Sequence, residues 1–416
     1  MTSTPPSTLT PPPFVTPPTT PASAAMASGC YQPQIQQWLF PKASMGGVSL
    51  PMMDSLGRIR LLGMNEGLSP ETYIALLHLY VSILEADRMV ASVHEHLALT
   101  PKLIANDAHH AVTRLDASKH THNLYYKRED QTAIKAYKAR GAYCGMKHAM
   151  DASHMSDFIA VSTGNHAQGI LRAAELLQPK RVRIVVPTNT SKTKLEKINY
   201  RIDTARSCGV DASVLFKGDT FDEARRWAVQ QQSQGGGYYL DPYSNPFVVA
   251  GQGTIGLELF RQLRPILEAN PCIEEIVIIS PIGGGGLLAG TATALRMAAA
   301  WDALFQRVEL KFVGLRLTDM ATTYGDAVRV KEVAEGNRYI FDMLDITRLK
   351  MNDDHMAWGM KHVLDDLGDR VEGPSGATAY FALNQIELMP NEHRLVVGIL
   401  SGGNVGAFPQ ANAFDW

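Results

Sequence analysis

The sequence has few of the features that mark secreted, membrane-bound or nucleic-acid-binding proteins. Only four cysteines occur in 416 residues, and no two of them have the spacing of a metal site or a disulfide framework. No apolar run is long enough to span a bilayer. The formal net charge of −2 provides no basic surface for nucleic acid or for an anionic membrane. We therefore expect a cytoplasmic protein with reduced cysteines and with neither a nucleic-acid nor a membrane partner.

Charge is also missing from the start of the chain, where no charged residue precedes Lys42. Residues 2–21 consist almost entirely of proline, threonine and serine. Such a segment buries too little apolar surface to offset the entropy of ordering, so residues 1–30 are predicted to be a disordered tail. The tail lacks the arginines of a transit peptide and the basic start and apolar core of a signal peptide.

From residue 124 onward, short apolar runs alternate with longer segments of helical periodicity. This alternation is typical of an α/β fold in which helices cover both faces of parallel sheets. We expect strands at 123–127, 158–162, 181–187, 212–217, 273–281, 308–316 and 394–401. After a mainly helical lead-in around 65–100, we expect helices at 136–150, 167–177, 192–208, 221–234, 254–263 and 287–300. Three successive glycines at 235–237 indicate the passage between two α/β domains.

Residues 126–142 place one lysine, Lys138, just inside a predicted helix start. A lone lysine in a helix is nearly always solvated, as we expect for Lys135 and Lys147. Lys138 differs because small residues follow it at 139, 141 and 142, which permits close packing around the helix start. A lysine held in a dry pocket keeps its amine unprotonated part of the time and can form a Schiff base with an aldehyde.

A second polar stretch, residues 162–168 (Ser-Thr-Gly-Asn-His-Ala-Gln), follows an apolar run and opens a helix. One interpretation is a strand-to-helix turn in which Asn165 caps the helix. Backbone N–H groups and hydroxyls at a helix start also form an anion site that suits a carboxylate. His166 on its own is more typical of a structural residue than of a catalytic one.

Four successive glycines, Gly283, Gly284, Gly285 and Gly286, join an apolar strand-like run to an apolar helix. Four glycines in a row often form a flexible linker, but a linker rarely has such neighbours. Glycines let backbone N–H groups turn inward as a nest for a phosphate, helped by the helix dipole. Neither the P-loop pattern nor Gly-x-Gly-x-x-Gly fits these residues. A further polar turn, residues 401–404 (Ser-Gly-Gly-Asn), ends the last predicted strand.

Together these motifs resemble the threonine/serine dehydratase family of pyridoxal-phosphate (PLP) enzymes, which have the fold of tryptophan synthase β (fold type II). The resemblance runs from about residue 68 to 405 and includes stretches 187–194, 241–246, 250–258 and 371–377. It implies an α/β protein with two three-layer, parallel-sheet domains and PLP in the cleft between them. The implied division places the lead-in and part of the large domain at 31–132, the small domain at 133–238 and the rest of the large domain at 239–416.

The resemblance also implies a role for each motif. Lys138 would form the Schiff base with PLP and later remove the Cα proton, while Asn165 would contact the ring hydroxyl. Ser401 would face the ring nitrogen, and a hydroxyl there leaves that nitrogen largely unprotonated, which favours elimination over transamination. The glycine run would hold the phosphate. The substrate is expected to contact Tyr137, Ser162, Thr163, Gly164, Asn165 and His166.

Two departures from the family pattern concern the reaction. Ala136 and Tyr137 stand where the family usually has Ser-Phe before the lysine, so the substrate preference is expected to shift. Thr163 stands where related racemases have a serine that acts as acid or base on the second face of the substrate. Thr163 is therefore a second candidate catalytic residue.

Two further departures concern metal binding and regulation. Arg316 stands where some relatives have a carboxylate that binds a divalent cation, so we expect no metal site, although Asp319 could replace that carboxylate. The chain ends soon after Asn404, so we expect no regulatory domain and no feedback inhibition by isoleucine.

The resemblance implies an ammonia-lyase reaction on a β-hydroxy amino acid, with L-threonine or L-serine as the default substrate and a 2-oxo acid as product. Two alternatives keep the cofactor, namely β-replacement by a second nucleophile and racemisation through Thr163. A remote alternative is a non-catalytic binding protein that retains the fold. The expected partners are a small amino-acid substrate and a second copy of the chain in a homodimer.

Overall fold

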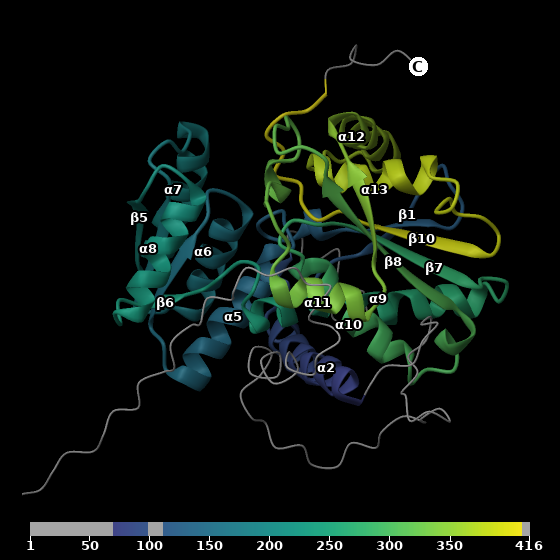
Figure 1. Ribbon diagram of the computed structural model, residues 1–416, viewed down its shortest axis with the longest axis horizontal. Helices are drawn as coiled ribbons and strands as arrows, with labels where there is room; N and C mark the ends of the chain where they lie inside the picture. Colours follow the sequence, from purple (N-terminus) through teal and green to yellow (C-terminus); the bar gives the residue numbers. More distant parts are fainter. Residues whose placement is uncertain (1–69, 99–110, 410–416) are drawn as a thin grey trace, which may run out of the picture.

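The structure is a computed structural model, and it describes residues 70–98 and 111–409. The predicted tail at residues 1–30 lies outside the described residues. Within them, two sheets stand side by side, each with helices packed on it, the smaller sheet on the left of Figure 1 and the larger on the right. Across these residues no helix has both the length and the apolarity to cross a membrane.

The larger sheet has the strand order β1–β2–β10–β7–β8–β9. Its strands are β1 (Leu115–Ala117), β2 (Leu124–Lys127), β7 (Glu275–Pro281), β8 (Glu309–Leu317), β9 (Thr347–Met351) and β10 (Arg394–Ile399). Only the pair of β1 with β2 is antiparallel among these strands. Every residue of the central strand β7 is buried, as expected for a parallel strand that helices cover on both faces.

The smaller sheet is fully parallel, with the order β5–β4–β3–β6. It consists of β3 (Asp157–Val161), β4 (Arg181–Val186), β5 (Asp211–Phe216) and β6 (Tyr238–Tyr239). Three helices pack around it: α6 (Asn165–Leu177), α7 (Lys192–Ser207) and α8 (Phe221–Ser233). Because β6 pairs with β3, the chain stays in this sheet to Tyr239, beyond the three glycines that indicated the crossing. The expected domain boundaries stay a prediction.

Helices lie on both sides of the larger sheet (Figure 1). On one side lie α2 (Pro70–Ala91), α9 (Pro246–Ala269) and α10 (Gly286–Ala299); on the other lie α12 (Asp353–Leu367) and α13 (Gly373–Asn384). The remaining short helices are α3 (His94–Leu97), α11 (Glu335–Met343), η1 (Glu129–Gln131), η2 (Phe305–Arg307) and η3 (Asp326–Val328). Helix α5 (Lys138–Ser153) packs against both α6 and α9, so it joins the two sheets.

The predicted helix at 254–263 is too short, because the observed helix α9 begins at Pro246 and ends at Ala269. The side chain of Asn245 accepts hydrogen bonds from the N–H groups of Phe247 and Val248, and proline suits the first helical position. No element was predicted between β8 and the strand expected at 394–401, yet this region contains β9, α11, α12 and α13.

The parallel pairing of β2, β10, β7 and β8 places the carboxyl ends of these strands along one edge of the larger sheet. Three of the sequence motifs follow these strand ends: the lysine after β2, the glycine run after β7 and Ser401 after β10. Sites in open α/β sheets form at this edge, so the topology brings the motifs to one place.

Candidate active site

Lys138 is the first residue of α5 and is only 8% exposed. Its Nζ donates a hydrogen bond of 2.9 Å to the carbonyl of Pro242. The ammonium also lies 5.0 Å from the ring centre of Tyr137 and 4.8 Å from that of Tyr243. Burial lowers the pKa of Lys138 to about 7, against the opposing effect of Asp241. A substantial fraction of the amine is therefore neutral near pH 7, as Schiff-base chemistry requires.

The turn after β10 lies directly beside this lysine. The N–H of Tyr137 donates to the carbonyl of Ser401 at 3.1 Å, and Ala136 forms an isolated antiparallel bridge with Gly402. The hydroxyl of Ser401 is 3.2 Å from that of Ser375, at the start of α13. The backbone therefore fixes the Ser401 turn against the residues just before Lys138.

The glycine run joins β7 to α10, as the sequence predicted. Gly285 precedes the first helical residue with a φ of +92°, a conformation that favours glycine. A Cβ on Gly284 would lie 2.3 Å from the ring of Tyr243. Asn337 donates to the carbonyls of Gly284 and Tyr243, each at 2.8 Å, and so fixes the carbonyl side of the run.

The N–H side of the same run is open. Within residues 70–98 and 111–409, no acceptor takes a hydrogen bond from the N–H groups of residues 283–286. These donors stand at the N-terminus of a buried helix, where the helix dipole favours an anion. Tyr243 contacts both Gly284 and the ammonium of Lys138, so the lysine and the glycine run belong to one site.

Asn165 does not cap α6, contrary to one sequence-based interpretation. The cap position is Gly164, and Asn165 is the first helical residue. Its Nδ2 donates to Oε1 of Glu372 at 2.8 Å, and its Oδ1 accepts from Nδ2 of Asn404 at 2.9 Å. The amide turns away from its own helix because the buried carboxylate and the Asn404 amide satisfy both of its ends.

The remaining residues of this loop have different environments. Ser162 Oγ accepts a hydrogen bond of 3.1 Å from the N–H of Gly164, which shapes the turn. Thr163 is half-buried beside it, and its side chain makes no hydrogen bond to any residue that the structure describes. His166 is buried with Nε2 3.0 Å from the carbonyl of Leu240, and burial lowers its pKa to about 3. A neutral ring bonded to the backbone indicates a structural residue.

Residues 108–402 match the protein family described as pyridoxal-phosphate dependent enzyme. The chain belongs to this family. It is 33% identical over 297 residues to threonine dehydratase 2 (biosynthetic, chloroplastic) of Solanum lycopersicum. It is 29% identical over 306 residues to the biosynthetic L-threonine dehydratase of Escherichia coli. Each alignment covers 68% of this chain but only 46% and 53% of the relatives, so the chain spans about half of their length.

A solved structure gives the same assignment at the level of the fold. The processed form of threonine deaminase isoform 2 from Solanum lycopersicum superposes with a TM-score of 0.63 at 26% identity. The match covers 88% of this chain and 96% of that chain. The chain therefore has the parallel-sheet α/β fold of PLP enzymes of fold type II, as predicted, and PLP is its cofactor.

Two independent observations indicate that the glycine run and Lys138 suit PLP. The open N–H groups of residues 283–286 are donors of the kind that a phosphate requires, and side chains there would strike Tyr243. The buried amine of Lys138 is the partner that an aldehyde requires. Sequence reasoning assigned no role to four residues near these groups: Tyr243, Asn337, Glu372 and Ser375. Only Asn337 lies outside the stretches 241–246 and 371–377 that carried the resemblance.

Arg316, which stands where some relatives are expected to have a metal-binding carboxylate, is half-buried near the end of β8. Arg316 donates to the carbonyl of Lys331. Asp319 lines a cavity with Asp353 and Asp354, but its Oδ1 accepts from the N–H of Ala321. In the part of the chain that the structure describes, no group of three or more His, Cys, Asp or Glu residues could hold a metal ion. Independence from divalent cations stays a prediction.

Proposed function

We propose that this chain is a PLP-dependent ammonia-lyase that converts a β-hydroxy amino acid, such as L-threonine or L-serine, to a 2-oxo acid and ammonia. The observation that carries the proposal is the buried amine of Lys138, held beside the Ser401 turn and linked through Tyr243 to the glycine run. The names of the relatives, threonine dehydratase and threonine deaminase, support the substrate class.

Each part of the cofactor has a proposed holder. The N–H groups of residues 283–286 take the phosphate, Asn165 takes the ring hydroxyl, and Ser401 faces the ring nitrogen. When bound, PLP supplies the electron sink that makes the Cα proton acidic.

The chain's own residues then bind the substrate and move the proton. The start of α6, with Ser162 and the loop from Thr163 to His166, takes the substrate carboxylate at a helix N-terminus. Lys138 Nζ removes the Cα proton, and its lowered pKa matches a base that works near neutral pH. Tyr137, half-buried beside that amine, lies where it can distinguish substrates by their side chains.

The test is to incubate the purified, PLP-loaded protein with a panel of amino acids and to assay 2-oxo acid and ammonia. L-Threonine or L-serine should give both products in equal amounts. Lys138→Ala should abolish turnover and the visible absorbance of bound PLP, whereas Lys135→Ala, an exposed lysine three residues earlier, should keep both. A new amino acid as product would favour β-replacement, and the mirror-image amino acid would favour racemisation through Thr163. A protein that binds PLP but consumes no amino acid would contradict the proposal.

The cytoplasmic location, the homodimer and the absence of a nucleic-acid partner stay predictions.

A further inference from the structure

Glu372 has a buried carboxylate that does not cap the helix it precedes. It stands at the N-cap of α13, yet it makes no side-chain cap hydrogen bond there and is 8% exposed. Its Oε1 accepts instead from Nδ2 of Asn165 at 2.8 Å and from the N–H of Asn404 at 3.2 Å. A Cβ on Gly402 would come within 2.8 Å of the carboxylate, so the turn after β10 packs directly on it.

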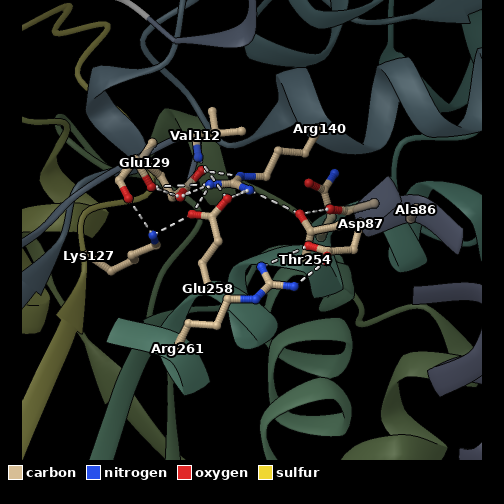
Figure 2. A network of polar contacts seen from close by, with 12 residues as sticks. Ala86, Asp87, Val112, Lys127, Glu129, Arg140, Thr254, Glu258 and Arg261 are labelled. Atoms are coloured by element: carbon tan, nitrogen blue, oxygen red, sulfur yellow. Dashed lines mark hydrogen bonds and ion pairs between the residues drawn. The ribbon is translucent and has the colours of Figure 1, made fainter. Parts of the chain in front are cut away.

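In the described part of the chain this carboxylate has no ion-pair partner, whereas several other buried acids have one. Glu258 is paired with both Lys127 and Arg140 in the network of Figure 2. Among the residues that the structure describes, no lysine, arginine or histidine nitrogen lies within 4.0 Å of the Glu372 carboxylate. A buried, unpaired carboxylate is costly, and such groups concentrate at functional sites.

Glu372, Asn165 and Asn404 form a triangle of hydrogen bonds, and this triangle allows only one orientation of the Asn165 side-chain amide. Asn404 Nδ2 donates to Oδ1 of Asn165 at 2.9 Å and also to the carbonyl of Ile134 at 2.7 Å. A flipped Asn165 amide would set its NH₂ against the NH₂ of Asn404 and its oxygen against the carboxylate. In the observed orientation, one N–H of Asn165 goes to Glu372 and the second has no acceptor among the described residues.

We propose that Glu372 is a positioning residue that, together with Asn404, fixes the Asn165 amide so that its second N–H donates to the ring hydroxyl of PLP. This inference rests on the proposed function, because it takes from there the contact between Asn165 and the cofactor. Three segments far apart in sequence meet in the triangle: the start of α6, the start of α13 and the turn after β10.

The triangle needs an acceptor at Oε1 rather than a full negative charge. Burial raises the pKa of Glu372 to about 7; the hydrogen bonds from Asn165 and Asn404 and the charge of Lys197 oppose this rise, while Asp326 adds to it. Both hydrogen bonds fall on the same oxygen, so the single carbonyl oxygen of a glutamine can accept them both. Glu372→Gln is therefore the conservative variant, and Glu372→Met, of similar length but without an acceptor, is the disruptive one.

The experiment measures PLP affinity and the visible absorbance band of the bound cofactor in four loaded enzymes: the wild type, Glu372→Met, Asn165→Ala and the double variant. We expect Glu372→Met to raise the Kd for PLP about tenfold and to shift the band, as loss of a charge-assisted hydrogen bond would. In the Asn165→Ala background, Glu372→Met should add nothing further. Glu372→Gln should retain the wild-type band and affinity.

Two additions keep the outcome decisive. Glu175→Met, which removes a buried glutamate of α6 that is paired with Arg172 and Arg201, should lower stability but leave the band unchanged. If Glu372→Met does not fold, Asn404→Ala tests the same triangle and should also be non-additive with Asn165→Ala. Equal losses from Glu372→Met in both backgrounds, or a Glu372→Gln as impaired as Glu372→Met, would overturn the inference. Absent turnover in a wild type that binds PLP would instead overturn only the proposed reaction.

Discussion

At the scale of single residues, the protonation of Lys138 decides when the chain can react with an aldehyde. Only the neutral amine attacks, and the pKa of Lys138 is lowered to about 7 by burial. Its neutral fraction therefore rises about tenfold per pH unit below pH 7 and levels off above about pH 8, whereas an exposed lysine continues to rise to about pH 10. The rate of PLP incorporation into apoenzyme, followed by absorbance, should have this shape.

The control for this pH profile is Glu372→Gln, because burial also raises the pKa of Glu372 to about 7. The variant should keep the lysine profile, since it removes a second buried group with a pKa of about 7, close to Tyr137. A rate that keeps increasing up to pH 10 would mean that Lys138 is solvated in the apoenzyme.

At the scale of elements, the turn from β7 to α10 tolerates no side chain at Gly284. A Cβ there would lie 2.3 Å from the Tyr243 ring, which also lies against the ammonium of Lys138. Gly284→Ala should therefore move the ring or the loop and weaken PLP binding by at least about tenfold, as loss of one charge-assisted hydrogen bond would. Titration of the apoenzyme with PLP measures this. Gly406→Ala, which meets nothing within 4 Å, should bind PLP normally.

Helix α5 carries Lys138 and is fixed two residues later by a buried ion network (Figure 2). Arg140 pairs with Glu129 at 2.8 Å and with Glu258 at 2.6 Å, and all three side chains are at most 2% exposed. Removing one partner of a buried pair leaves an uncompensated charge, so Arg140→Met should lower the free energy of unfolding by about 3–5 kcal/mol. Chemical denaturation measures this change.

The matched control for Arg140→Met lies on the same helix. Lys147 pairs with Asp151 at 2.6 Å, but these side chains are 35% and 54% exposed. Lys147→Met should cost no more than about 1 kcal/mol, because solvent screens an exposed pair. Equal losses for the two variants would show that the buried network does not stabilise α5 beyond an ordinary surface contact.

Sequence reasoning found the elements that neighbouring residues specify, by an apolar run or by the turn residues that bound it. Strand β7 is an unbroken buried run between turn residues, and α10 follows four glycines, so both could be predicted. Helices α12 and α13 could not, because they need glycines that helix propensity disfavours. A Cβ on Gly359 would come within 1.9 Å of the carbonyl oxygen of Gly376, so close packing of the two helices requires them.

The same limit applies to the candidate site. Lys138 and the glycine run carry a local signal, and the structure places them in one site through Tyr243. Glu372 lies in the matched stretch 371–377, but the sequence gives it no role, because its hydrogen-bond partner Asn165 is 207 positions earlier in the chain. The roles of Lys138, the glycine run and the other site residues toward cofactor and substrate, Thr163 and Ser401 included, stay predictions.

At the scale of the whole molecule, the proposed PLP site takes groups from both sheets: residues 162–168 after β3 of the smaller sheet, and residues 283–287 after β7 of the larger one. Helix α5 packs between them on α6 and α9.

A ligand that binds only the native state adds about 2.7 kcal/mol of stability at 100 times its Kd. PLP should therefore raise the melting temperature of the apoenzyme and slow amide hydrogen exchange in both segments together. Inorganic phosphate, the control, should protect 283–287 alone. Protection by PLP confined to one sheet would show that the cofactor does not bridge the two.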